Sequence, residues 1–172
     1  MKLAFLDKDG TLVKPVTNGK FVQSPNDQEL IEGVEEALNK LTDDGYDLVI
    51  VSNQGGVAAG HKTLESAIDE MRYAMALTNI DTAYFCPDFE GDQCYMVTAD
   101  DSEALHETCL PEILGSFRKP GSGMLKLAAY RFFEEYLDFD NCLMVGDRGE
   151  DEESAVDAGV PFQWANEWRG EY

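Results

Sequence analysis

Basic residues are scarce in this sequence. Its 172 residues include 13 lysines and arginines against 34 aspartates and glutamates, which gives a formal net charge of −21 at pH 7. A chain this acidic is repelled at long range by nucleic acids and by anionic membranes. The composition therefore disfavours tight binding of long polyanions and is typical of a strongly solvated, acidic surface.

Long apolar runs are also missing. No stretch of the sequence approaches the roughly 20 apolar residues that a helix needs to span a bilayer. The N-terminus leads straight into a short apolar segment, without the cationic prefix and longer apolar stretch of a signal peptide. We therefore expect a soluble, cytoplasmic protein that has no membrane partner.

Internal repeats, low-complexity tracts and linkers are absent as well. A chain of this length can bury a sizeable core without disulfides or a structural metal. We therefore predict a single domain over residues 1–172, with one sizeable insertion at about residues 87–117 and no large cap domain.

The most informative segment is an apolar run that ends in two acids. Residues 3–6 are Leu-Ala-Phe-Leu, and Asp7 and Asp9 follow on either side of a lysine, just before a Gly-Thr turn. Such a run is typical of a buried parallel strand, and ligands of open α/β sheets bind beyond the carboxyl ends of these strands. Crowded carboxylates at that place favour a divalent cation, although an acidic turn after a strand would give the same pattern.

Three later segments favour a divalent-cation site over a simple acidic turn. The apolar run 49–51 ends in Ser-Asn-Gln-Gly-Gly at residues 52–56, and the apolar run 143–145 ends in Gly-Asp-Arg-Gly-Glu-Asp at residues 146–151. Between them, Phe-Arg-Lys-Pro at residues 117–120 places cations in a loop that precedes a helical pattern.

In this order, the four segments resemble the signature motifs of the haloacid dehalogenase (HAD) superfamily of phosphohydrolases, from Asp7 to Asp151. They are most similar to its compact branch, which acts on histidinol phosphate, heptose bisphosphate and polynucleotide 3′-phosphate. The resemblance implies a Mg²⁺-dependent phosphomonoesterase with an aspartyl-phosphate intermediate and a small phosphorylated metabolite as substrate. A polynucleotide 3′-phosphatase is the alternative. A non-catalytic phospho-ligand binding protein is a further alternative, which the presence of both Asp7 and Asp9 disfavours.

The resemblance also assigns roles to individual side chains. Asp7 is the expected nucleophile, Asp9 the general acid and base, and Lys119 the cation that steadies Asp7 and the phosphoryl group. Mg²⁺, which prefers oxygen ligands, would be held by Asp7, Asp147 and the backbone carbonyl of Asp9. Asp151 would either bind metal-bound water from a second shell or stabilise the start of a helix.

Further residues are candidates for phosphate or substrate contacts. The Ser52 hydroxyl and the backbone N–H groups around Lys8 and Asn53 can bind phosphate oxygens. Ser52 could instead be a polar residue that merely ends a strand. Arg118 and Arg148 could contact the substrate, or they could be solvated surface arginines.

Alternating patterns predict an α/β fold with a Rossmann-like parallel sheet. The expected strands cover residues 2–6, 46–51, 82–85, 142–145 and 160–164, and the expected helices cover residues 31–41, 64–75, 124–136 and 150–158. The HAD resemblance implies the strand order 3-2-1-4-5, which brings the ends of the first, second and fourth strands together.

Three of the four cysteines lie in or beside the insertion. Zinc-bearing relatives in the resembled branch carry a loop of three cysteines and one histidine there. In this sequence Cys86 and Cys94 keep the outer spacing, whereas Asp88 replaces the histidine. Zn²⁺ could be held by Cys86, Cys94 and Cys109 with Asp88 or His106. We favour the alternative, a degenerate loop of reduced thiols.

Overall fold

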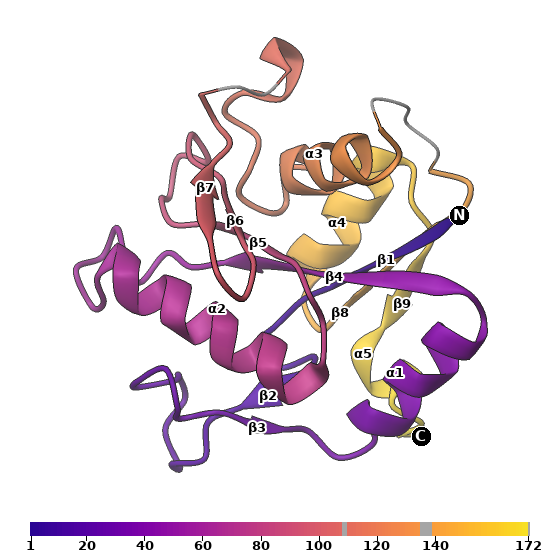
Figure 1. Ribbon diagram of the computed structural model, residues 1–172, viewed down its shortest axis with the longest axis horizontal. Coiled ribbons are helices and arrows are strands. Elements are labelled where there is room, and N and C mark those ends of the chain that lie inside the picture. The colour runs from indigo at the N-terminus through magenta and orange to yellow at the C-terminus, as the bar shows by residue number, and fades with distance from the viewer. Residues whose placement is uncertain (108–109, 135–138, 172) are drawn as a thin grey trace.

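The central sheet of the computed structural model runs through the molecule with helices on both faces (Figure 1). The structure describes residues 1–107, 110–134 and 139–171. The sheet has seven strands in the order β7-β6-β5-β4-β1-β8-β9. These strands are β1 (Lys2–Leu6), β4 (Tyr46–Asn53), β5 (Ala83–Cys86), β6 (Tyr95–Val97), β7 (Ser102–Ala104), β8 (Cys142–Gly146) and β9 (Phe162–Trp164).

Five of these strands form the predicted parallel sheet. β1 pairs in parallel with β4 and with β8, β4 pairs with β5, and β8 pairs with β9. The order β5-β4-β1-β8-β9 confirms the predicted order 3-2-1-4-5 and the α/β fold class.

The apolar run of β1 explains its central place. Leu3, Ala4, Phe5 and Leu6 are all fully buried, as expected for a strand covered on both faces. Leu3 and Phe5 belong to the core under α3 (Gly123–Phe132) and α4 (Gly149–Ala158), which lie on one face (Figure 1). Ala4 and Leu6 belong to the core under α1 (Val34–Asp43) and α2 (Leu64–Thr78) on the other face.

Several short elements were not predicted from the sequence. β6 and β7 lie within the insertion and extend the sheet as antiparallel edge strands. β2 (Val13–Lys14) and β3 (Glu29–Leu30) form a separate antiparallel pair, and η1 (Pro111–Ile113) and α5 (Ala165–Trp168) are short helices. The described part of the insertion thus adds edge strands and a turn of helix instead of a large cap.

The helices agree with the predicted patterns apart from their ends. The first begins at Val34 instead of residue 31, because Gly33 lies before it with φ 86°, outside helical geometry. α3 ends at Phe132, short of the predicted residue 136, because Phe133 and Glu134 form a turn in which Glu134 has φ 54°, outside helical geometry. Residues 135–136 of the predicted helix lie outside the described residues. None of the helices in the described ranges is long and apolar enough to cross a membrane.

Candidate active site

Asp7 lies directly after β1 and is fixed from two sides. Its Oδ1 accepts a hydrogen bond from the Lys119 ammonium at 2.7 Å, and its Oδ2 accepts one from the Thr11 hydroxyl at 3.1 Å. The ammonium of Lys119 also donates to Asp151 Oδ1 at 2.6 Å and to the Val51 carbonyl at 3.1 Å. Because Asp7, Lys119 and Asp151 are all buried, this arrangement leaves the Asp7 carboxylate little rotational freedom.

Negative charge is in excess at this point. Burial raises the pKa of Asp7 to about 8; the Lys119 ammonium acts in the opposite direction, and the Asp151 and Asp147 carboxylates add to the rise. Burial by itself would lower the pKa of Lys119, but the carboxylates of Asp7 and Asp151 outweigh it and raise that pKa. A single lysine therefore does not neutralise the site, and a second cation would relieve the remaining repulsion.

The carboxylate cluster offers a place for that cation. Oxygen atoms of Asp7, Asp147 and Asp151 lie within 4.8 Å of one another, and among the described residues no other group of three or more potential His, Cys, Asp or Glu ligands is so close. Gly10, with φ 83°, makes room for the Asp147 carboxylate, because a Cβ atom at this position would collide with it. Hard oxygen donors of this kind suit Mg²⁺.

Asp151 stabilises the start of α4, which is one of the two roles considered for it. Its Oδ2 accepts hydrogen bonds from the backbone N–H groups of Asp147 and Arg148, at 3.2 and 3.1 Å, where α4 begins. Its Oδ1 is taken by Lys119. Both oxygens therefore already have partners within the protein, and a contact of Asp151 with metal-bound water stays a prediction.

Asp9 contacts a different set of side chains. Its Oδ1 lies 2.7 Å from the Lys8 ammonium and its Oδ2 3.4 Å from Gln54 Nε2, while 42% of its side chain stays exposed. Lys8 is fully buried, and its ammonium also contacts Gln28 at 3.1 Å and Glu70 at 3.3 Å. Burial alone would lower the pKa of Lys8, but the Asp9 and Glu70 carboxylates raise it. The expected phosphate contact of Lys8 therefore rests on its backbone N–H, since its ammonium is occupied within the protein.

Ser52 and Asn53 end β4 next to Asp7. The buried Ser52 hydroxyl accepts a hydrogen bond from Gln54 Nε2 at 2.8 Å. The side chain of Asn53 binds the backbone of Lys119, accepting from its N–H at 3.0 Å and donating to its carbonyl at 2.9 Å. As with Lys8, only the backbone N–H of Asn53 is left for the expected phosphate contact.

The two candidate arginines differ in their surroundings. The Arg118 guanidinium lies 5.4 Å from the centre of the Phe89 ring, and its Nη1 is buried without a hydrogen-bond partner in the described part of the chain. The Arg148 side chain is 57% exposed and lies 3.6 Å from Glu150. A substrate contact of either arginine stays a prediction.

Cys86 and Cys94 belong to no group of three or more close potential metal ligands among the described residues. Cys86 donates a hydrogen bond to Asp88 Oδ1 at 3.1 Å, and burial together with this bond raises the pKa of its thiol to about 12. The His106 ring lies 3.2 Å from the backbone N–H of Cys94, and Cys109 lies outside the described residues. Cys86 is thus a thiol donor in this arrangement, and the zinc alternative stays untested.

Sequence reasoning missed several polar residues that support the site. They are Thr11, Gln28, Gln54, Glu70 and Arg169. The position of Glu70 could have been predicted from helical spacing, because it lies three residues after Ala67 and one before Met71 on the buried face of α2. An acid at such a position has to find a buried partner.

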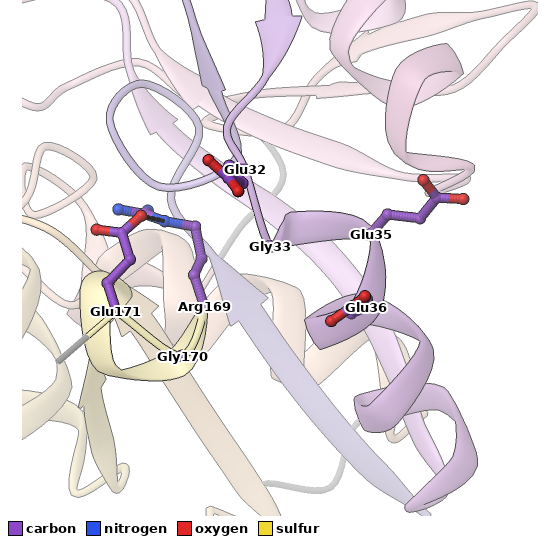
Figure 2. Close-up of a pocket in the computed structure, with 7 residues that line it drawn as sticks. All are labelled: Glu32, Gly33, Glu35, Glu36, Arg169, Gly170 and Glu171. Atoms are coloured by element: carbon purple, nitrogen blue, oxygen red, sulfur yellow. Dashed lines mark hydrogen bonds and ion pairs between the residues drawn. The ribbon is translucent and has the colours of Figure 1, made fainter.

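A hollow of about 530 Å³ lies between the start of α1 and the C-terminal turn (Figure 2). Four of its seven lining residues are glutamates, and none is a candidate catalytic residue. An anionic phosphate would be repelled there, so this hollow is not the expected substrate site.

Comparisons with known proteins match this chain over most of its length. A family model described as polynucleotide kinase 3 phosphatase matches residues 2–164. A D-glycero-D-manno-heptose-1,7-bisphosphate 7-phosphatase from Thermosynechococcus vestitus is 32% identical over 161 residues, which cover 90% of this chain and 74% of the relative. The D-glycero-β-D-manno-heptose-1,7-bisphosphate 7-phosphatase from Haemophilus ducreyi is 35% identical over 170 residues, with 92% and 79% covered.

A solved structure points to the same branch. The D,D-heptose 1,7-bisphosphate phosphatase from B. bronchiseptica, complexed with magnesium and phosphate, superimposes with a TM-score of 0.66 at 27% identity, covering 94% of this chain and 79% of that one. The fold, the carboxylate cluster and these relatives lead to one conclusion: the chain belongs to the polynucleotide kinase 3 phosphatase family and is a phosphatase of the HAD superfamily.

Proposed function

We propose that this phosphatase is a Mg²⁺-dependent phosphomonoesterase that acts through an aspartyl-phosphate on Asp7, with a small phosphorylated sugar as its substrate. The observation that carries the proposal is the buried Asp7 carboxylate, held by Lys119 at 2.7 Å beside Asp147 and Asp151. The names of the heptose-bisphosphate relatives support the substrate class, and the neighbour with bound magnesium and phosphate supports the cofactor.

Asp7 is suited to attack a phosphorus atom because its carboxylate is already oriented. Lys119 and Thr11 hold its two oxygens, so little ordering is left for the reaction itself. Asp7, Asp147 and the backbone carbonyl of Asp9 would hold Mg²⁺, which when bound neutralises the repulsion between a carboxylate and a phosphate dianion. The Lys119 ammonium supplies a second positive charge to the phosphoryl oxygens.

Asp9 is suited to move protons because its side chain stays partly exposed, two residues after Asp7 in the sequence. In the first step it donates a proton to the leaving oxygen as Asp7 forms its bond to phosphorus. In the second step Asp9 takes a proton from the water that hydrolyses the aspartyl-phosphate, which restores both residues. The Ser52 hydroxyl and the backbone N–H groups of Lys8 and Asn53 would bind the phosphate oxygens.

A polynucleotide 3′-phosphate end is the second candidate substrate, because the matching family carries that description. The net charge of −21 opposes it, since local lysines cannot screen a long polyanion beyond a Debye length of about 10 Å. A short sugar phosphate presents only its own charge.

We also keep the single domain over residues 1–172 and the cytoplasmic location as predictions.

Catalytic efficiency on the two substrate classes distinguishes these candidates. The kcat/KM for heptose 1,7-bisphosphate and for a 3′-phosphorylated oligonucleotide would be measured with Mg²⁺ at low and at high salt. We expect the sugar phosphate to be preferred at low salt and the gap to narrow at high salt, because screening helps the polymer more. A strong preference for the oligonucleotide at low salt would move the protein into nucleic-acid end repair.

A further inference from the structure

The carboxylate of Asp9 belongs to a closed ring of charged and polar side chains. Lys8 joins Asp9 Oδ1 to Glu70 Oε2, with distances of 2.7 and 3.3 Å from its ammonium. On the other side, Gln54 lies 3.4 Å from Asp9 Oδ2, and Lys62 joins Gln54 at 3.0 Å to Glu70 Oε1 at 2.8 Å. Both oxygens of Asp9 are therefore connected, by two separate routes, to the two oxygens of one glutamate.

Glu70 is the point at which the ring is anchored to the rest of the fold. It lies on the buried face of α2, and only 3% of the residue is exposed. Its backbone carbonyl also accepts a hydrogen bond from Gln28 Nε2 at 3.0 Å, and Gln28 Oε1 accepts one from Lys8 at 3.1 Å. The helix thus sets the position of Lys8 from two directions.

We propose that Glu70 is a positioning residue for Asp9: the ring that it closes fixes the Asp9 carboxylate so that the exposed part faces the leaving oxygen of the substrate. This inference rests on the proposed acid and base role of Asp9. Glu70 itself contacts no substrate, because it is buried: its Oε1 accepts a hydrogen bond from Lys62, and its Oε2 is ion-paired with Lys8 at 3.3 Å without a hydrogen bond from any described residue.

Charge balance explains why a glutamate is needed at this place. The ring contains two acids and two lysines, so its formal charges cancel. Without the negative charge of Glu70, the buried Lys8 ammonium would keep Asp9 as its one charged partner in the ring and would draw the carboxylate inward. Lys62 would also lose its ion pair with Glu70, and its ammonium would no longer be fixed where it donates to Gln54.

The leaving-group dependence of the first chemical step tests this role. Glu70→Gln keeps the shape of the side chain and removes its charge. Single-turnover release of phenol from phenyl phosphate and of 4-nitrophenol from 4-nitrophenyl phosphate would be measured, because phenol needs a proton from a general acid far more than 4-nitrophenol does. We expect the rate ratio of 4-nitrophenyl to phenyl phosphate to rise about tenfold or more in the variant.

The matched control is Asp69→Asn, which removes a charge from the neighbouring residue of α2. The Asp69 side chain is 56% exposed, and its one ion pair among the described residues is with Arg72 at 4.0 Å, so the ratio should stay at the wild-type value. Equal losses on both substrates in Glu70→Gln, or no loss on either, would overturn the inference, because a purely structural role does not depend on the leaving group.

Two more variants keep the test decisive. Lys62→Met interrupts the ring at a side chain that is 20% exposed, so it should fold even if Glu70→Gln does not, and it should raise the ratio in the same direction. Asp9→Asn tests the underlying role: its ratio should rise further than that of either ring variant. If Asp9→Asn leaves the ratio unchanged, the proposed function of Asp9 fails; if only the ring variants leave it unchanged, the role of Glu70 alone fails.

Discussion

Asn53 and Lys119 bind each other through a reciprocal pair of hydrogen bonds across 66 residues of sequence. The Asn53 amide accepts from the Lys119 backbone N–H at 3.0 Å and donates to the Lys119 carbonyl at 2.9 Å. The pair fixes the main chain from which the Lys119 ammonium reaches Asp7. The end of β4 thereby determines where the cation of a distant loop lies.

Asn53→Asp should lower kcat about tenfold or more, because a small displacement of a catalytic group is costly. The new carboxylate keeps the acceptor but has no N–H for the Lys119 carbonyl, and the two oxygens would repel each other. Steady-state kinetics on 4-nitrophenyl phosphate would show the loss. Asn39→Asp, on the exposed face of α1, adds the same charge and should leave kcat unchanged; an equal loss there would point to overall charge instead.

Mg²⁺ affinity should rise with pH up to about 8 in the metal-free protein. Burial raises the pKa of Asp7 to about 8, so at neutral pH a proton competes with the metal for this carboxylate. We expect the affinity to fall about tenfold for each pH unit below that pKa. Titration calorimetry in buffers of different ionisation enthalpy would detect the released proton.

Asp7→Asn serves as the control for this proton release. The variant has no carboxyl group to deprotonate at this position, so its remaining Mg²⁺ binding should release fewer protons. A wild-type affinity that stays constant between pH 6 and pH 8 would contradict the assigned pKa of Asp7.

Arg169 should stabilise the turn after Asp9, although it lies beyond the matched family residues 2–164. Its guanidinium donates to the carbonyls of Gly10 and Thr11 at 3.2 and 2.9 Å, and its side chain is only 8% exposed (Figure 2 shows its surroundings). Arg169→Met should lower the free energy of unfolding by about 1–3 kcal/mol, measured in urea, and should reduce kcat. Arg131→Met is the control: the Arg131 side chain on α3 is 39% exposed, and its replacement should leave kcat unchanged.

Asp27 should contribute stability at neutral pH that is lost in acid. Backbone N–H groups of Thr17 and Gln23 donate to its carboxylate, both at 2.9 Å, and these bonds hold its pKa below the ordinary 3.8. A lowered folded-state pKa means that the stabilisation is complete above the unfolded-state pKa and disappears as the pH falls through the folded-state value. Urea unfolding of wild type and Asp27→Asn should therefore differ at pH 7 and converge toward pH 3; a constant difference would argue against this ionisation.

The fold could be predicted where the sequence carries a regular pattern. Apolar runs of three or four residues, each followed by polar motif residues, located the central strands. β6 and β7 have three residues each, and β2 and β3 have two, which is too short for a period to show.

The sequence predicted which residues follow the central strands, but it did not predict the partners of the side chains around them. Asp7, Ser52 and Asp147 lie at the ends of the adjacent strands β1, β4 and β8. Their proximity follows from the strand order alone. The direction of a side chain is a tertiary property. Lys8 and Asn53 lie inside the motifs, yet the Lys8 ammonium binds Glu70 and the Asn53 amide binds Lys119, partners that no local pattern identifies.

The phosphorylated residue is the most direct test of the central claim. The protein would be mixed with substrate and Mg²⁺, quenched in acid within one turnover, digested and mapped by mass spectrometry. The account predicts a phosphoryl group on Asp7 that is absent from Asp7→Asn, a variant that stays folded but does not turn over. A phosphoryl group on another residue, or near wild-type turnover by Asp7→Asn, would contradict it.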